Sequence, residues 1–215
     1  MELFYHPLSR YSQKVLIALY EKQANFYPRV IELSDPFSRN EFKQQFPLGK
    51  LPLLKTRTGE LLPESSIIID YIDHEFATGT QLLPQSYAER LQVRLYDRII
   101  DNDLNNQLYL LEQIDARKEE NPIKVKQLEK DITHLLSELN NKLMEHHWLC
   151  GDAFTMADCA LIPCLIHAKH RFKLYQFDPL DRYLNQAHIR GAWIQVQEEI
   201  DLIQAAVQAG FRPIP

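Results

Sequence analysis

The sequence predicts a small α/β domain followed by an all-helical domain, and two observations support this prediction. Short apolar runs bounded by turn signals alternate with helix-like patterns up to residue 77. Beyond a linker at 78–86, which holds Gly79, Pro84 and small polar residues, every periodic segment has helical spacing. We therefore expect an α/β domain over 1–77 and an all-α domain over 87–215.

The first domain is expected to run βαβ and then αββα. The strands are predicted at 3–5, 25–33, 51–54 and 61–62, and the helices at 13–23, at 35–46 and directly after Glu64 to Ser66. The first crossover should be right-handed and join parallel strands. Pro28 indicates an edge position or a break in the second strand, and Ser38 with Glu41 three residues later is typical of a capping box.

The second domain is expected to consist of helices alone. They are predicted at 87–118, 123–144, 155–169, shortly after Pro179, and at 192–209. Thr155 followed by Asp158 has the spacing of a capping box at the start of the third of these helices.

Composition excludes several classes of function. The chain has 215 residues, 45% of them hydrophobic and 25% charged, and a formal net charge of −5, so it lacks the overall basic character of nucleic-acid-binding proteins. No apolar run reaches the length of a membrane span, and the N-terminus does not read as a signal peptide. Three cysteines in one short segment are a poor disulfide framework. We expect a cytoplasmic protein that binds neither nucleic acid nor membrane.

The loop between the first strand and the first helix carries Ser9 and Ser12. A helix N-terminus offers free N–H groups and partial positive charge, which stabilise an anion such as a thiolate. A hydroxyl donor together with this dipole lowers a thiol pKa from about 8.5 by about one to two units. Ser12 has the spacing of a cap for the N–H of Lys14 or Val15, and Ser9 is freer to face a ligand. The pattern leaves open which serine activates a thiol.

A second group of polar residues lies at the start of the helix after the predicted hairpin. Glu64 and Ser65 place an acid and a hydroxyl there, and Ser66 is expected to cap the helix. Capping alone explains one serine, whereas the pair is also suited to bind a charged ligand.

These motifs, taken in order, resemble those of the glutathione transferases. The resemblance rests on Ser-x-x-Ser in the first loop, Gly49-Lys50-Leu51-Pro52, Glu64-Ser65-Ser66, and the segment from Gly151 to Pro163. It covers nearly the whole chain. It implies a thioredoxin-like N-terminal domain, an all-α C-terminal domain, and glutathione as co-substrate.

The resemblance also implies a role for individual residues. Leu51, before a cis Pro52, would hold the cysteinyl backbone of glutathione, and Glu64 with Ser65 would hold its γ-glutamyl end. Lys50 is expected to meet the glycyl carboxylate. Arg10 stands where many relatives have proline, and is expected to assist in binding the thiolate or the substrate.

The resulting expectation is a homodimeric detoxification enzyme that conjugates glutathione to a small hydrophobic electrophile or reduces one. We expect no metal, because Cys164, His167 and His170 have metal-like spacing but lack a fourth ligand. The alternative is a non-catalytic adaptor of the same fold, similar to stringent starvation protein A, that binds a protein partner such as RNA polymerase.

Overall fold

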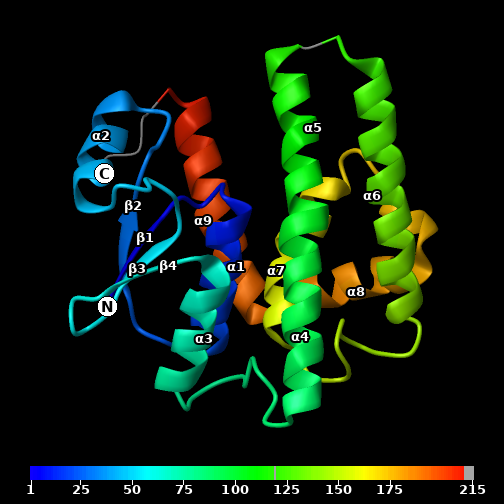
Figure 1. The fold of residues 1–215 in the computed structure, drawn as a ribbon, viewed down its shortest axis with the longest axis horizontal. Coiled ribbons are helices and arrows are strands. Elements are labelled where there is room, and N and C mark those ends of the chain that lie inside the picture. The colour runs from blue at the N-terminus through cyan, green and yellow to red at the C-terminus, as the bar shows by residue number, and fades with distance from the viewer. Residues whose placement is uncertain (119, 211–215) are drawn as a thin grey trace. The chain divides into compact units, whose positions relative to one another are not determined.

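The structure is a computed structural model, and it describes residues 1–118 and 120–210. The chain divides into two compact units, which are treated separately below (Figure 1). The first contains residues 1–81 together with those from Arg190 onward, and the second contains residues 82–189. Across the described residues, none of the helices combines the length and the apolar character needed to cross a membrane.

A four-stranded mixed sheet forms the centre of the first unit. Its strands are β1 (Glu2–Tyr5), β2 (Tyr27–Val30), β3 (Leu53–Lys55) and β4 (Leu61–Pro63). They lie in the order β2-β1-β3-β4, with β1 parallel to β2 and antiparallel to β3, and β4 antiparallel to β3. The predicted parallel pairing of the first two strands is therefore confirmed.

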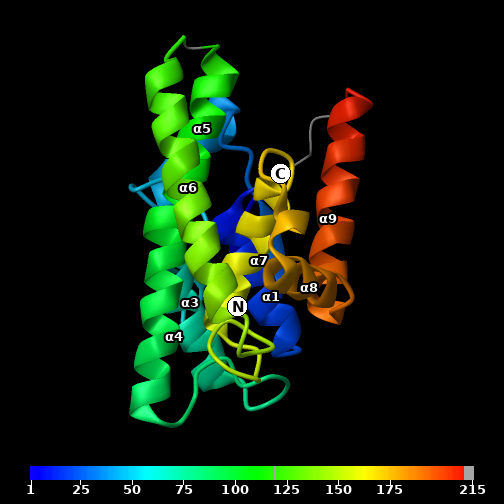
Figure 2. The same cartoon turned by 90° about the vertical axis from the view of Figure 1, so that its right-hand side faces the viewer.

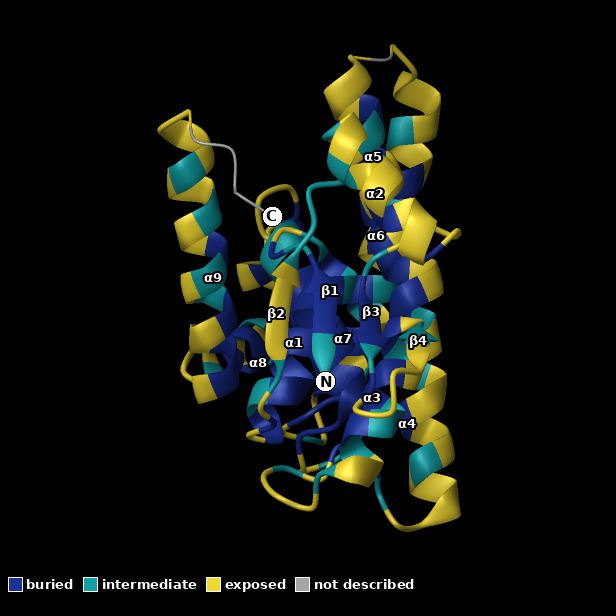
Figure 3. Ribbon diagram, turned by 90° about the vertical axis from the view of Figure 1, so that its left-hand side faces the viewer, coloured by how far each residue is buried: buried dark blue, intermediate teal, exposed yellow. Residues whose placement is uncertain are grey.

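Burial follows the position of each strand in the sheet. Figure 3 shows β1 largely buried between its neighbours and β2 largely exposed. Pro28 lies in β2, where its missing N–H removes no bond from the interior of the sheet. The sequence left an edge position and a strand break open for this segment, and the structure shows the edge position.

Four helices pack with the sheet in this unit. They are α1 (Arg10–Glu21), α2 (Pro36–Gln45), α3 (Ser65–Glu75) and α9 (Gly191–Gln208). The buried face of α1 contacts both α3 and α9. Between α1 and α3, Lys22 Nζ lies 3.0 Å from Asp73 Oδ1, and both side chains are less than 10% exposed.

The start of α2 differs from the prediction. Asp35, rather than Ser38, caps this helix, because the Asp35 carboxylate accepts the Ser38 N–H at 2.8 Å. The helix then contributes Phe42 to a core cluster with Phe4 and Leu53.

The second unit is helical. Its elements are α4 (Tyr87–Ile99), the π-helical segment η1 (Ile100–Asn105), α5 (Asn106–Arg117), α6 (Pro122–Lys142), α7 (Met156–Ala168), the 3₁₀ turn η2 (Leu174–Gln176) and α8 (Asp178–His188). Figure 1 shows α4, η1 and α5 as one continuous helix, which matches the single helix predicted over 87–118. In Figure 2, α5 and α6 run side by side, and the two helices are in contact.

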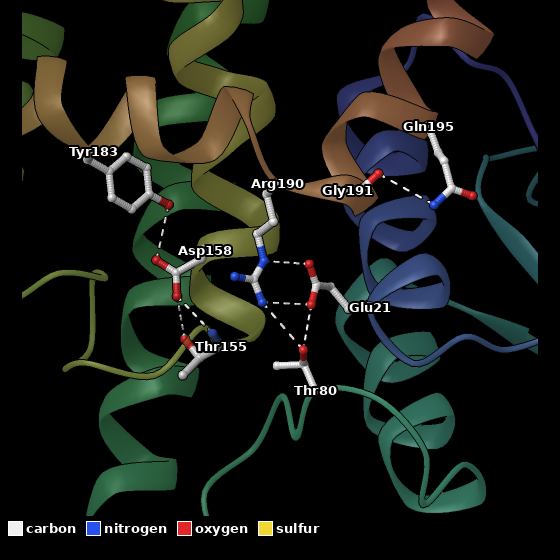
Figure 4. Close-up of polar contacts among 8 residues, drawn as sticks. All are labelled: Glu21, Thr80, Thr155, Asp158, Tyr183, Arg190, Gly191 and Gln195. Carbon is white, nitrogen blue, oxygen red and sulfur yellow. Dashed lines mark hydrogen bonds and ion pairs between the residues drawn. The ribbon is translucent and has the colours of Figure 1, made fainter.

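The capping box at the start of α7 is present as predicted. Asp158 is fully buried and accepts the N–H and the hydroxyl of Thr155 and the hydroxyl of Tyr183 (Figure 4). It also accepts the N–H of Leu149. Burial raises the pKa of Asp158 to about 6, although these hydrogen bonds act in the opposite direction. The carboxylate therefore serves to organise this unit.

The C-terminal helix is grouped differently from the sequence-based expectation. The predicted all-α domain included every residue from 87 to 215, whereas α9 belongs to the first unit and buries Trp193, Val196 and Ile200. Residues 211–215 of that predicted domain lie outside the described residues.

Candidate functional site

The topology of the sheet brings several connecting segments to one edge. Because β1, β2 and β4 run in the same direction, the segments that follow them begin at the same edge of the sheet. Since β3 runs in the opposite direction, the segment before it also reaches that edge. Four segments therefore lie at this edge: the loop around Ser9, the segment from Ile31, the Leu51 region and the start of α3.

A cavity of about 300 Å³ opens at this edge. The residues that line it come from the loop after β1, the segment after β2 and the turn before β3: His6, Leu8, Ser9, Ile31, Glu32, Leu33 and Leu51. It thus combines an apolar wall with one hydroxyl, one imidazole and one carboxylate.

Ser9 lies at the N-cap position of α1. Its backbone is extended (φ −84°, ψ 121°), and its carbonyl accepts the Gln13 N–H at 2.8 Å, the first bond of the helix. The side chain makes no capping hydrogen bond. Ser9 therefore lines the cavity at the positive end of the α1 dipole, where an anion is stabilised, and its hydroxyl is not used as a cap.

The predicted role of Ser12 as the cap of this helix is wrong. The helix begins at Arg10, three residues earlier than the sequence suggested, and Ser12 is inside its first turn. Ser12 is fully buried, and its Oγ accepts the His6 N–H at 3.3 Å. Through this hydrogen bond Ser12 holds the loop against α1, and it does not line the cavity.

The residues before β3 are divided between the cavity and the core. Leu51 lines the cavity and packs against the core cluster formed around Phe42, whereas Pro52 is buried. The Leu51–Pro52 peptide bond is cis. Lys50 is exposed and lies outside the lining.

The start of α3 places the acid and serine pair at the same edge of the sheet. Glu64 is exposed at the N-cap, with φ +69° and ψ 116°, a conformation that residues other than glycine rarely adopt. Such strained backbone is concentrated at functional sites. Ser65 is the first helical residue and is buried. The expected cap, Ser66, is instead the second helical residue and accepts a hydrogen bond from Lys14 Nζ at 2.9 Å.

Of the predicted site residues, the structure brings Ser9 and Leu51 together in the cavity lining. Glu64 and Ser65 lie at the same edge but outside the lining, and Arg10, the first residue of α1, is largely buried. The sequence analysis missed His6 and Glu32. The available signal was their position, since each follows a predicted strand end or lies close to one.

Tyr5, the last residue of β1, carries a further hydroxyl near this loop. Its hydroxyl donates to Glu199 Oε2 on α9 at 2.6 Å. Burial and this carboxylate together hold the pKa of Tyr5 well above its ordinary value. The Tyr5 hydroxyl therefore keeps its proton and donates it to the hydrogen bond with Glu199.

The potential metal ligands that the sequence suggested do not form a cluster. Within the described residues, no group of three or more His, Cys, Asp or Glu side chains is arranged to hold a metal ion. His167 Nδ1 instead lies 3.6 Å from Glu112 Oε1. Cys150, Cys159 and Cys164 form no disulfide bond with one another.

Comparison with known proteins identifies both parts of the chain. Residues 3–80 match the family model of the glutathione S-transferase N-terminal domain, and residues 115–193 match that of the C-terminal domain. Glutathione S-transferase GstA of Escherichia coli O157:H7 is 28% identical over 167 residues, which cover 77% of this chain and 81% of that protein. The stringent starvation protein A homolog of Coxiella burnetii is 28% identical over 170 residues, covering 79% of this chain and 77% of the homolog.

Solved structures agree with the fold. A glutathione S-transferase from Methylobacillus flagellatus KT, solved with glutathione bound, superposes with a TM-score of 0.80 at 23% identity and covers 91% of this chain and 98% of its own. A glutathione S-transferase from Anopheles dirus species B gives 0.87 at 18% identity, covering 97% and 100%. The predicted fold, a thioredoxin-like α/β domain followed by an all-α domain, is thereby confirmed, and the chain belongs to the glutathione S-transferase family.

Proposed function

We propose that this protein is a glutathione transferase, which binds glutathione at the sheet edge described above and activates its thiolate for reaction with a small hydrophobic electrophile. The observation that carries the proposal is Ser9, which lines the cavity at the N-terminus of α1 and whose hydroxyl makes no capping bond. A hydroxyl donor and a helix dipole aimed at one point favour a thiolate over a thiol.

The remaining contacts to glutathione are proposed from the position of each residue at the edge. Leu51 would hold the cysteinyl backbone, and Glu64 with Ser65 would hold the γ-glutamyl ammonium and carboxylate. Lys50, exposed just before Leu51, would meet the glycyl carboxylate. Arg10 and Pro52 would support the loop and the turn from the buried side.

The reaction is proposed to be attack of the thiolate on an electrophile. The sulfur forms a bond to an electrophilic carbon with loss of a leaving group, or it reduces a peroxide with a second glutathione as the co-reductant. The apolar lining from Leu8, Ile31 and Leu33 favours a hydrophobic substrate. The cytoplasmic location expected from the cysteine pattern fits a reducing, glutathione-rich compartment.

We also propose a homodimer. On α4, Tyr87, Leu91 and Leu95 recur every fourth residue, and each is about half exposed or more (77%, 53% and 48%). Residues at this spacing share one face of a helix, and an apolar face of this kind is suited to a partner subunit. Light scattering should give twice the 25.3 kDa mass of the chain. A monomer at micromolar concentration would contradict the proposal.

The test of the function is glutathione binding followed by turnover. Isothermal titration should detect binding of glutathione, and also of its analogue in which the thiol is replaced by a methyl group. Thermal stability should rise with ligand, because a ligand at 100 times its dissociation constant adds about 2.7 kcal/mol. Glu64→Ala should weaken the binding of glutathione and of the methyl analogue equally. Ser9→Ala should impair turnover more than the binding of glutathione. No binding at millimolar glutathione would refute the proposal.

A second candidate is an adaptor that uses the transferase fold to bind a protein such as RNA polymerase. The similarity to the stringent starvation protein A homolog of Coxiella burnetii favours it. Capture of purified RNA polymerase by a protein that does not bind glutathione would support the adaptor. Binding and turnover of glutathione without such capture would support the enzyme.

A further inference from the structure

His6 holds the loop that carries Ser9 through three separate hydrogen bonds. Its carbonyl accepts the Ser9 N–H at 2.9 Å, and its own N–H donates to Ser12 Oγ at 3.3 Å. Its ring nitrogen Nδ1 accepts the Leu8 N–H at 3.2 Å. The ring contact is the one that depends on the side chain, and it acts on the residue directly before Ser9.

The Leu8 contact determines where the ring carries its proton. Because Nδ1 accepts a hydrogen bond, it carries no hydrogen itself. The neutral imidazole therefore has its hydrogen on Nε2. Nε2 is buried and lies 3.3 Å from Glu32 Oε2, at ion-pair distance but without the alignment of a hydrogen bond. The negative carboxylate favours a proton on the nitrogen that faces it.

Glu32 is itself held in place. Its Oε1 accepts the Ser34 N–H at 2.9 Å, which leaves Oε2 toward His6. Burial acts to raise the pKa of Glu32, but opposing interactions, led by the hydrogen bonds from Ser34, lower it overall, so the carboxylate is charged at neutral pH. The contacts thus run from Ser34 through Glu32 and His6 to Leu8.

The neighbouring residue of the loop is fixed independently of His6. Gln13 Nε2 on α1 donates to the Pro7 carbonyl at 2.7 Å, in a buried position. Loss of the His6 ring would therefore leave Pro7 anchored and release the Leu8 N–H. The displacement would be local to Leu8 and Ser9, which both line the cavity.

We propose that His6, kept in its Nε2–H form by Glu32, is a positioning residue that sets the Ser9 hydroxyl toward a thiolate bound in the cavity. This inference rests on the proposed function, because it assigns a partner to the hydroxyl that the function requires. His6 acts through the loop and transfers no proton. Its effect falls on the thiolate and on turnover more than on ligand affinity.

The variants that test this role differ in one property of the side chain at position 6. His6→Leu removes the acceptor for the Leu8 N–H. His6→Asn restores an acceptor, because its Oδ1 is separated from Cα by the same number of bonds as Nδ1 of histidine. His134→Leu is the matched control, since His134 is exposed on α6 in the other unit.

The readouts are the thiolate absorbance of bound glutathione as a function of pH, and kcat and KM for glutathione. His6→Leu should raise the pKa of the bound thiol by about one unit and lower kcat about tenfold, with KM changed less than about twofold. His6→Asn should recover most of the loss, and His134→Leu should match the wild type. Equal thiol pKa values in wild type and His6→Leu, with normal glutathione binding, would overturn the positioning role alone.

A measurement on the free protein separates this inference from the proposed function. Nitrogen-15 NMR of the histidine ring at neutral pH should show Nδ1 unprotonated and Nε2 protonated, and Glu32→Ala should weaken that preference. A proton on Nδ1 in the wild type would overturn the inference even if glutathione binds. This measurement decides the point if His6→Leu does not fold. Failure of the wild type to bind glutathione would overturn the proposed function and, with it, this role.

Discussion

Arg190 and Glu21 form a two-point ion pair at the start of α9. Arg190 Nε lies 2.5 Å from Oε1 of Glu21, and Nη2 lies 2.8 Å from Oε2 (Figure 4). The hydroxyl of Thr80 donates to the same carboxylate at 2.6 Å. The Glu21 side chain is only 6% exposed, so these donors replace the hydrogen bonds that water would make to it. The pair joins the end of α1 to the residue that precedes α9.

Arg190→Ala should lower the free energy of unfolding by about 2 to 3 kcal/mol. Breaking a buried pair costs about 3 to 5 kcal/mol, and the 27% exposure of the Arg190 side chain reduces that figure. Arg190→Lys should cost about 1 kcal/mol, because the charge remains but the planar two-point contact is lost. Urea unfolding measures both values.

The control for this prediction is Arg39→Ala, an exposed arginine on α2, which should change stability by less than about 0.5 kcal/mol. The double variant Glu21→Ala with Arg190→Ala should be less destabilised than the sum of the single variants. Additive losses would show that the two residues act independently.

Neither the ion pair nor the place of α9 in the first unit could be predicted from the sequence, because both depend on contacts between residues far apart along the chain. Apolar periodicity placed a helix at 192–209, close to the observed 191–208, because that pattern is local. Its partners Glu21, Tyr5 and Tyr20 are more than 160 residues away along the chain. No local pattern shows which unit such a helix joins, and the sequence prediction followed chain order instead.

Glu199 provides a second connection between α9 and the rest of the first unit. Its two carboxylate oxygens accept the hydroxyls of Tyr5 and Tyr20. Tyr5→Phe should cost about 1.5 to 3 kcal/mol, the usual range for a hydrogen bond to a charged group. Tyr20→Phe should cost less, because Tyr20 is less buried. Tyr175→Phe, at an exposed position, is the control.

The hydrogen bonds of Tyr5 and Tyr20 to Glu199 predict a loss of stability at alkaline pH. Burial and the Glu199 carboxylate raise the pKa values of Tyr5 and Tyr20 well above the ordinary value of 10.0. Above that value the unfolded chain releases protons that the folded chain retains, so stability is lost as the pH rises toward the folded pKa values. Tyr5→Phe should flatten this alkaline decline. An unchanged slope in that variant would argue against the raised pKa.

Asp158 should make the free energy of unfolding depend on pH in the acidic range. Its folded pKa is about 6, above the ordinary value of 3.8, so the folded chain holds a proton in this range that the unfolded chain releases. The contribution is fully present below the unfolded pKa and is lost as the pH rises through about 6. The stability advantage of the wild type over Asp158→Asn should therefore shrink between pH 4 and about 7. An advantage that grows over this range would show that the hydrogen bonds outweigh burial.

At the candidate site, the sequence identified the segments better than the roles of single residues. The segments around Ser9 and Leu51 and the start of α3, which the sequence analysis singled out, lie at one edge of the sheet, because the strand directions determine which connections meet there. The wrong assignment of Ser12 as the cap arose because the helix start was predicted three residues too late, and helix ends are among the least regular features of a pattern. His6 and Glu32 belong to no recognisable motif, and they lie close together only because β1 and β2 pair in register.

The last prediction separates the two serines by stability and by activity. Ser9→Ala removes a hydroxyl that makes no capping bond, so the free energy of unfolding should change by less than about 0.5 kcal/mol. If Ser9 donates to the thiolate of bound glutathione, the same change should raise the thiol pKa and lower turnover at neutral pH. Ser12→Ala removes a fully buried hydroxyl and leaves the His6 N–H without its acceptor, which should cost about 1 to 3 kcal/mol. Because that N–H belongs to the loop, some activity should also be lost, but raising the pH should restore activity in Ser9→Ala far more than in Ser12→Ala. Thermal unfolding together with pH–rate profiles decides the assignment, and a stable Ser12→Ala protein with an alkaline-shifted profile would transfer the thiolate role to Ser12.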